Sequence, residues 1–179
     1  MYELVILSLG SNLGDREENL AAAITLLGTF NEVKNIKSAS FYESEPLYNT
    51  NQPNFLNTII SCDSSLNPFD FLDKIKHIEF TLGRPKERDK NQPRIIDIDI
   101  LCYGNSYIET DELIIPHPEL IFRKFVLLPF CELIPDYHIE KIGSTISELL
   151  SSCPDKSKVV KHIMAVSYTH LTLPTICSV

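Results

Sequence analysis

The stretch Ile95–Tyr103 constrains the fold of this chain most strongly, because isoleucine and aspartate alternate through it as Ile-Asp-Ile-Asp-Ile. Strict alternation of apolar and polar residues is typical of a β-strand with two unlike faces. Side chains two positions apart project from the same face of a strand, so Asp97 and Asp99 share one face. The pattern therefore predicts a strand that carries two neighbouring carboxylates.

Further strands and helices are indicated by the spacing of apolar residues along the chain. Strands are expected over residues 4–9, 37–42 and 55–61, and short apolar helices over 126–133 and 145–150. Two amphipathic helices should begin after Asp15, a good N-cap, and at Pro68, and should stop at Gly28 and Gly83. The order strand, helix, strand, strand, helix, strand is that of the ferredoxin-like α/β (α+β) fold. We expect a largely antiparallel sheet with helices packed on one face and extra elements at the C-terminal end.

Length and composition favour one globular enzyme-sized domain over residues 1–165. The chain has 179 residues, a net charge of −8 and five dispersed cysteines without a Cys-x-x-Cys pair. A negative net charge argues against a broad nucleic-acid-binding surface, and scattered cysteines indicate buried thiols in a reducing compartment. With no signal-peptide pattern and no apolar run long enough to span a membrane, a cytoplasmic location is expected.

The last residues stand apart from the rest of the chain. Residues 166–175 resemble an in-frame translation of an adapter used in sequencing libraries, and the stretch lacks helical or strand periodicity. We expect residues 166–179 to be either such a non-native tail or a natural disordered terminus, and we leave them out of the fold and the site.

The carboxylate pair on the predicted strand suggests a cation. Two carboxylates on one face of an apolar strand repel each other, and a hard cation such as magnesium between them removes that cost. The alternative is that both aspartates face solvent on a half-exposed sheet. Five cations lie just upstream, namely Arg84, Lys86, Arg88, Lys90 and Arg94. A basic exposed loop next to a carboxylate pair is suited to phosphoryl transfer from a metal-bound nucleotide, although a merely solvated loop is the alternative.

Several motifs occur in a fixed order that points to one family. They are Gly10-Ser-Asn-Leu-Gly-Asp, Ser44-Glu-Pro-Leu, Gln52-Pro-Asn-Phe-Leu-Asn57, Gly83-Arg84, Pro93-Arg-Ile-Ile-Asp-Ile-Asp-Ile-Leu101, Pro116-His117-Pro118 and Arg123-Lys-Phe-Val-Leu127. Together they resemble the 6-hydroxymethyl-7,8-dihydropterin pyrophosphokinases of folate biosynthesis, over about residues 3–135. The resemblance implies transfer of the diphosphate of ATP to the hydroxymethyl group of the pterin, with AMP as the other product.

The same resemblance implies roles for individual residues. Asp97 and Asp99 would hold two magnesium ions, and these aspartates with Arg84 and Arg94 would form the catalytic group. ATP, the co-substrate, would be contacted by Glu79, Arg84, Lys86, Arg94, His117 and Arg123. The pterin would stack between Phe55 and Phe125 and would be bound by Asn57, Ser44, Pro46 and Leu47. From the residues alone, the two phenylalanines could equally be core aromatics and His117 a plain loop residue.

This sequence departs from the family where Asn91-Gln92 replaces a usual Trp-Gly and where Lys86 replaces a common arginine. These changes concern rate and affinity and leave the reaction class intact. We expect a monomer that acts on small molecules, without nucleic acid or membrane. Three rival interpretations stay open. The first is an RNA-binding module on the same fold, which a gel shift would reveal. The second is another metal-dependent nucleotide enzyme, such as a nucleotidyl transferase or an ordinary kinase, the latter releasing ADP. The third is a damaged homologue that folds but does not turn over.

Overall fold

The computed structural model describes residues 1–47, 50–84 and 92–163. The first part of the described chain consists of β1 (Glu3–Ser11), α1 (Arg16–Leu27), β2 (Val33–Ser38), β3 (Tyr42–Ser44), β4 (Phe55–Ser64), α2 (Pro68–Thr81) and β5 (Asp97–Tyr103). The second part consists of β6 (Ile108–Glu109), β7 (Ile114–Ile115), the 3₁₀ helix η1 (Leu120–Phe122), α3 (Lys124–Leu133), β8 (His138–Ile139), β9 (Ser144–Thr145), α4 (Ile146–Ser152) and β10 (Val159–Lys161).

The main sheet confirms the expected ferredoxin-like arrangement. Its strands lie in the order β10-β3-β4-β1-β5, β2 also pairs with β4, and every pairing is antiparallel. The central β1 lies between β4 and β5, with Gly10 opposite both Asn57 and Asp97. Residues far apart in the sequence are thereby brought side by side at one end of the sheet.

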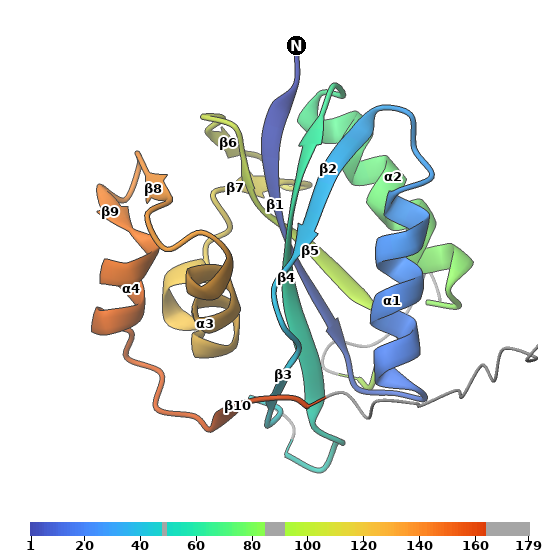
Figure 1. Cartoon of the computed structure of the whole chain (residues 1–179), viewed down its shortest axis with the longest axis vertical. Helices are drawn as coiled ribbons and strands as arrows, with labels where there is room; N and C mark the ends of the chain where they lie inside the picture. Colours follow the sequence, from blue (N-terminus) through green and yellow to red (C-terminus); the bar gives the residue numbers. More distant parts are fainter. Residues whose placement is uncertain (48–49, 85–91, 164–179) are drawn as a thin grey trace, which may run out of the picture.

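Helices cover both faces of this sheet (Figure 1). Helices α1 and α2 pack on one face, and the C-terminal α3 and α4 pack on the other. The alternation of β1 serves both layers, because Val5, Leu7 and Leu9 belong to the core under α1 and α2, whereas Ile6 belongs to the core under α3 and α4. The expected extra C-terminal elements therefore form a third layer.

Local signals set the ends of the helices as expected. The side chain of Asp15 accepts a hydrogen bond from the Glu18 amide at the start of α1, and Asn67 caps α2 just before Pro68. Gly83 follows the end of α2 with φ +94, a left-handed conformation that glycine adopts without steric cost. Within the ranges 1–47, 50–84 and 92–163, no helix is long and apolar enough to cross a membrane.

The prediction of one strand over residues 37–42 was wrong. The chain instead forms β2 and β3, which both pair with β4 but are separated at Ala39–Phe41. Ser40 leaves the sheet ladder because its amide donates to Oε1 of Glu132 on α3, at 2.8 Å. The short strands β6 to β10 carry too few residues for a visible alternation and were not predicted.

Candidate active site

A cavity of about 390 Å³ opens between the sheet and α3, at the end where β1 stops and β4 and β5 begin. All but two of the predicted site residues line it: Ser44, Pro46, Leu47, Phe55, Asn57, Arg84, Arg94, Asp97, Asp99, His117, Arg123 and Phe125. Of the other two, Glu79 lies behind the cavity wall and Lys86 lies outside the described residues, as do Arg88 and Lys90. The structure thus brings six separate sequence segments to one cavity.

The two aspartates of β5 project into this cavity from one face of the strand. Ile96, Ile98 and Ile100 face the core under α1 and α2, so Asp97 and Asp99 must face the opposite side. Both aspartates are half-buried, which disfavours the alternative that they are merely solvent-facing residues. The strand geometry expected from the alternation is confirmed.

Three guanidinium groups surround the aspartates. Nη1 of Arg84 lies 2.6 Å from Oδ1 of Asp97, and Arg94 pairs with the other oxygen of the same carboxylate. Burial, followed by the neighbouring charge of Asp97, raises the pKa of Asp99 to about 6, although Arg123, Arg84 and Arg94 oppose the rise. Within the described residues, the Nε atoms of Arg94 and Arg123 are buried without a hydrogen-bond partner. The cavity therefore offers buried cationic donors beside a carboxylate pair.

Glu79 supports this group from α2. It is 9% exposed, and its Oε1 accepts a hydrogen bond from the Ile98 amide at 2.8 Å and also pairs with Arg84. The turn at Gly83 brings Arg84 close to Glu79, and the Arg84 amide donates to the Glu79 carbonyl at 2.9 Å. Burial raises the pKa of Glu79 to about 7 despite the Arg84 charge. Glu79 thus holds both Arg84 and the edge of β5.

The cavity lining also includes aromatic and amide side chains. Phe55 on β4 and Phe125 on α3 both line the cavity and are half-buried, so neither is an ordinary core aromatic. Asn57 is 3% exposed, and its Nδ2 donates to Oγ of Ser44 at 2.9 Å. A Cβ added at Gly10 would lie 3.1 Å from Oδ1 of Asn57. The absence of a side chain at Gly10 therefore leaves space for the Asn57 side-chain amide.

His117 enters the cavity from the loop that follows β7. Its amide donates to the Leu101 carbonyl at 2.9 Å, and its Nδ1 accepts from the Glu119 amide at 3.2 Å. Burial and then the positive charge of Arg123 lower the pKa of His117. The imidazole is therefore favoured in its neutral form, with one nitrogen already committed to the backbone.

One buried residue that joins two parts of the site received no role from the sequence. Asn12 is 1% exposed, and its Oδ1 accepts from the Arg94 amide at 2.7 Å. Its Nδ2 donates to Oε1 of Gln52 at 3.1 Å and to the Pro53 carbonyl at 3.3 Å. The only local signal for such a role is an asparagine in a turn directly after a buried strand.

Two sequence expectations lie largely outside the described residues. The basic loop expected over residues 84–93 is described only at Arg84 and over 92–93. The proposed non-native tail, residues 166–179, is likewise outside.

Comparison with known proteins identifies the family. The family model described as 7,8-dihydro-6-hydroxymethylpterin-pyrophosphokinase (HPPK) matches residues 6–135. A 2-amino-4-hydroxy-6-hydroxymethyldihydropteridine pyrophosphokinase of Bacillus subtilis is 41% identical over 133 residues, 74% of this chain and 79% of its own length. The Pseudomonas aeruginosa enzyme of the same name is 34% identical over 154 residues, 86% of this chain and 94% of its own length.

Other relatives are longer than this chain. The match to the bifunctional protein FolKE of Lactococcus lactis, 40% identical over 148 residues, covers 82% of this chain but 42% of the relative. A crystal structure of an HPPK-DHPS in complex with substrates shares the fold, with a TM-score of 0.65 at 16% identity, over 85% of this chain and 43% of that one. The match over residues 6–135, together with the relatives of similar length, shows that the chain belongs to the 7,8-dihydro-6-hydroxymethylpterin-pyrophosphokinase family.

Proposed function

We propose that this chain transfers the diphosphate of ATP to the hydroxymethyl group of 6-hydroxymethyl-7,8-dihydropterin, as a step in tetrahydrofolate biosynthesis. The observation that carries the proposal is that one cavity is lined by two chemically distinct sets of residues, which we call its arginine-lined half and its aromatic half. The first set is Asp97 and Asp99 with three arginines, and the second is two phenylalanines with a buried asparagine. A cavity of this kind suits a reaction between a polyphosphate and a flat heterocycle.

The arginine-lined half is proposed to bind the phosphates of ATP. Guanidinium groups bind phosphate oxygens through paired hydrogen bonds. The Nε atoms of Arg94 and Arg123 have no hydrogen-bond partner among the described residues, and the Arg123 Nε lies 3.8 Å from Oε2 of Glu119. Arg84 adds a third cation, and Lys86, which lies outside the described residues, is proposed to contribute a fourth. His117 is proposed to contact the nucleotide, and Glu79 to contribute through Arg84.

Asp97 and Asp99 are proposed to hold two magnesium ions. Burial and mutual repulsion raise the pKa of Asp99, so a cation at this position would offset an existing electrostatic cost. Magnesium is held by one or two carboxylates together with waters and substrate phosphates. When bound, it would neutralise phosphate charge and lower the pKa of the pterin hydroxyl.

The aromatic half is proposed to bind the pterin. Phe55 and Phe125 would stack on its two faces, and the buried Asn57 amide would hydrogen-bond to its edge. Ser44 orients that amide, and the backbone of Pro46 and Leu47 lies at the same rim. Desolvated amide groups discriminate strongly against ligands that cannot pair with them, so this side would set the choice of heterocycle.

The reaction would then be a single in-line displacement. The oxygen of the pterin hydroxyl forms a bond to the β-phosphorus of ATP while the bond from that phosphorus to the α,β-bridging oxygen breaks. AMP leaves with that oxygen, and the hydroxyl proton is released to water. The residues of this chain act mainly by positioning the two substrates and by matching the charge of the phosphates. Arg84, Arg94, Asp97 and Asp99 are the proposed catalytic residues. No covalent enzyme intermediate is required.

Chromatography of the nucleotide products tests this function. The chain is incubated with ATP, magnesium and 6-hydroxymethyl-7,8-dihydropterin, and AMP that depends on the pterin is the expected product. Asp97→Asn should abolish AMP formation, whereas Asp136→Asn, at an exposed aspartate outside the cavity, should leave it unchanged. Formation of ADP would indicate an ordinary kinase. We also propose a monomer that does not bind nucleic acid, for which light scattering and an RNA gel shift are direct tests.

A further inference from the structure

The start of α3 carries two candidate site residues but lacks a cap of its own. Arg123 occupies the N-cap position and Phe125 is the second residue of the helix, yet the N-cap side chain makes no capping hydrogen bond. The first amides of a helix have no acceptor within the helix and need one from elsewhere. The acceptor for this helix comes from a distant part of the chain.

That acceptor is Asp155, which lies beyond α4. Its Oδ2 accepts a hydrogen bond from the Lys124 amide at 2.9 Å, and its Oδ1 accepts from the Ser157 amide at 2.8 Å. The Lys124 side chain returns the contact by donating from Nζ to the Ser157 carbonyl at 3.4 Å. Lys124 is the residue between Arg123 and Phe125, so Asp155 fixes the peptide that joins the two.

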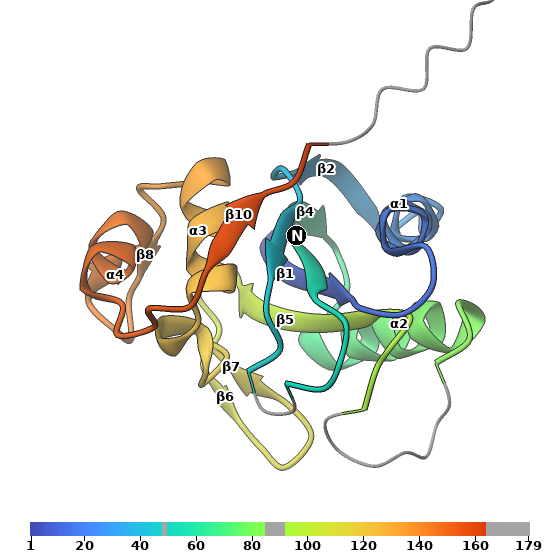
Figure 2. The same cartoon turned by 90° about the horizontal axis from the view of Figure 1, so that it is seen from below.

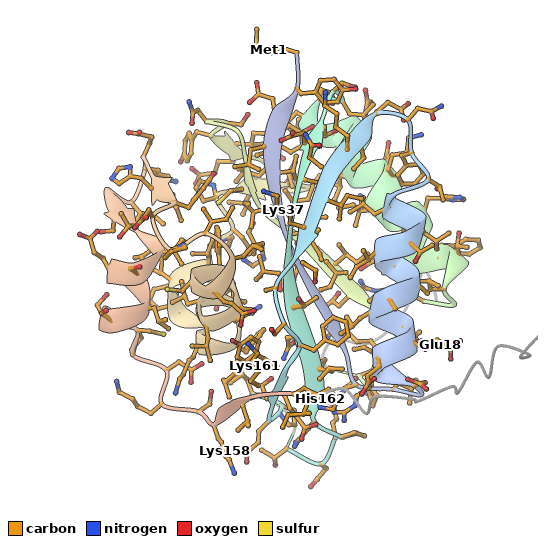
Figure 3. All side chains as sticks on the ribbon, viewed as in Figure 1. Met1, Glu18, Lys37, Lys158, Lys161 and His162 are labelled. Atoms are coloured by element: carbon orange, nitrogen blue, oxygen red, sulfur yellow. The ribbon has the colours of Figure 1, made fainter. Side chains whose placement is uncertain are left out.

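The segment that presents Asp155 is itself fixed at both ends. Before it, Cys153 is 6% exposed and belongs to the same core cluster as Val126 and Leu127 of α3. After it, β10 pairs with β3, and Nζ of Lys161 donates to Oε2 of Glu132, near the end of α3, at 3.2 Å. The segment passes beside α3 to the edge of the sheet (Figures 2 and 3). It lies beyond residues 6–135, which the family model matches.

Movement of the first turn of α3 would disturb both halves of the cavity. Arg123 lines the same cavity as Asp99 and His117. The carbon of its guanidinium group lies 5.9 Å from the centre of the Phe125 ring. Arg123 is proposed to bind phosphate and Phe125 to stack on the pterin, so the Lys124 residue between them joins a group proposed for each substrate.

We propose that Asp155 is a positioning residue, which caps α3 from outside the helix and thereby holds Arg123 and Phe125 in the geometry that diphosphate transfer needs. This inference rests on the proposed function. Asp155 does not line the cavity and is not expected to touch either substrate. Small displacements of positioning groups lower catalytic efficiency strongly, because the reacting atoms must be aligned to within a fraction of an ångström.

Three variants of the full chain test the inference. Asp155→Ala removes the cap, and Asp155→Asn keeps an oxygen that can accept from the Lys124 amide. Thr145→Ala is the matched control, since Thr145 caps α4 in the same way, by accepting from the Glu148 amide at 3.3 Å, yet does not line the cavity. Asp155→Ala should lower kcat/KM for ATP and for the pterin by roughly tenfold at 25 °C, whereas Thr145→Ala should destabilise the fold similarly without changing kcat/KM. Asp155→Asn should retain most of the activity.

The outcomes separate positioning from plain stabilisation. Equal kcat/KM values for Asp155→Ala and Thr145→Ala would overturn the inference, and so would an asparagine variant as impaired as the alanine variant. If the wild-type chain formed no AMP, the proposed function would fail, and amide hydrogen exchange over residues 121–127 would then decide. Faster exchange there in Asp155→Ala than in Thr145→Ala supports the external cap, and equal exchange refutes it.

Discussion

Replacing Glu79 with glutamine should change how folding stability depends on pH. Glu79 is buried behind the cavity, where its Oε1 accepts from the Ile98 amide at 2.8 Å and pairs with Arg84. Burial raises the pKa of Glu79 from 4.5 to about 7, against the opposing effect of the Arg84 charge. A carboxyl group whose pKa is higher in the folded than in the unfolded chain stabilises the fold while protonated, and this contribution is lost on ionisation.

The size of the effect follows from these two pKa values. The contribution is fully present below pH 4.5 and is lost as the pH rises through about 7. The pKa difference of 7 − 4.5 = 2.5 corresponds to about 3 kcal/mol in total. Between pH 5 and pH 8 the wild-type chain should therefore lose about 2–3 kcal/mol from this group alone. The Glu79→Gln variant keeps an acceptor for the Ile98 amide and has no group that titrates there, so it should escape this loss.

Urea unfolding at pH 5 and pH 8, without divalent cations, measures the effect. The free energy of unfolding of Glu79→Gln relative to wild type should be more favourable at pH 8 than at pH 5, by about 2–3 kcal/mol. Glu18→Gln, at an exposed glutamate on the outer side of α1 (Figure 3), is the control and should show no such change. If the Arg84 pair outweighed burial, the relative stability of Glu79→Gln would instead fall with pH, and that sign would refute the argument.

Three further changes have definite expected outcomes. Gly10→Ala places a Cβ 3.1 Å from Oδ1 of Asn57 and should raise the KM for the pterin roughly tenfold in steady-state assays; an unchanged KM would mean that Asn57 is not involved. Burial acts to raise the pKa of Glu132, but hydrogen bonds from Tyr42, Ser40 and Lys161 lower it to about 2. The wild-type chain should therefore lose stability as the pH falls from 4.5 towards 2. In acid titration by circular dichroism, Glu132→Gln should lack this loss of stability. The loss is at most about 1 kcal/mol, because the carboxylate is near the surface. Equal acid sensitivity of both proteins would contradict the lowered pKa of Glu132. Asp99→Asn should raise the Tm of the metal-free protein at pH 8, because it removes the buried repulsion between Asp99 and Asp97. The same change should lower AMP formation by about 100-fold or more. A lower Tm would argue against that repulsion.

The features that follow from neighbouring residues could be predicted from the sequence. The shared face of Asp97 and Asp99 follows from the alternation of a strand, and the start of α1 follows from an aspartate whose side chain reaches an amide three residues on. The ferredoxin-like class follows from the succession of strands and helices, because few arrangements bury their apolar faces with short connections, although the edge strand β10 was not among the predicted strands. The ordered motifs added the family and hence the candidate residues of the cavity.

Features that depend on a partner far along the chain could not be predicted. The break between β2 and β3 arises because Glu132, 92 residues away, takes the Ser40 amide, and nothing near Ser40 in the sequence indicates this. Likewise, the cap of α3 is Asp155, 31 residues beyond the amide that it accepts, so the local sequence shows only a helix without a cap. Local patterns record the conformational preferences of adjacent residues, whereas such long-range contacts depend on which surfaces meet once the layers have packed.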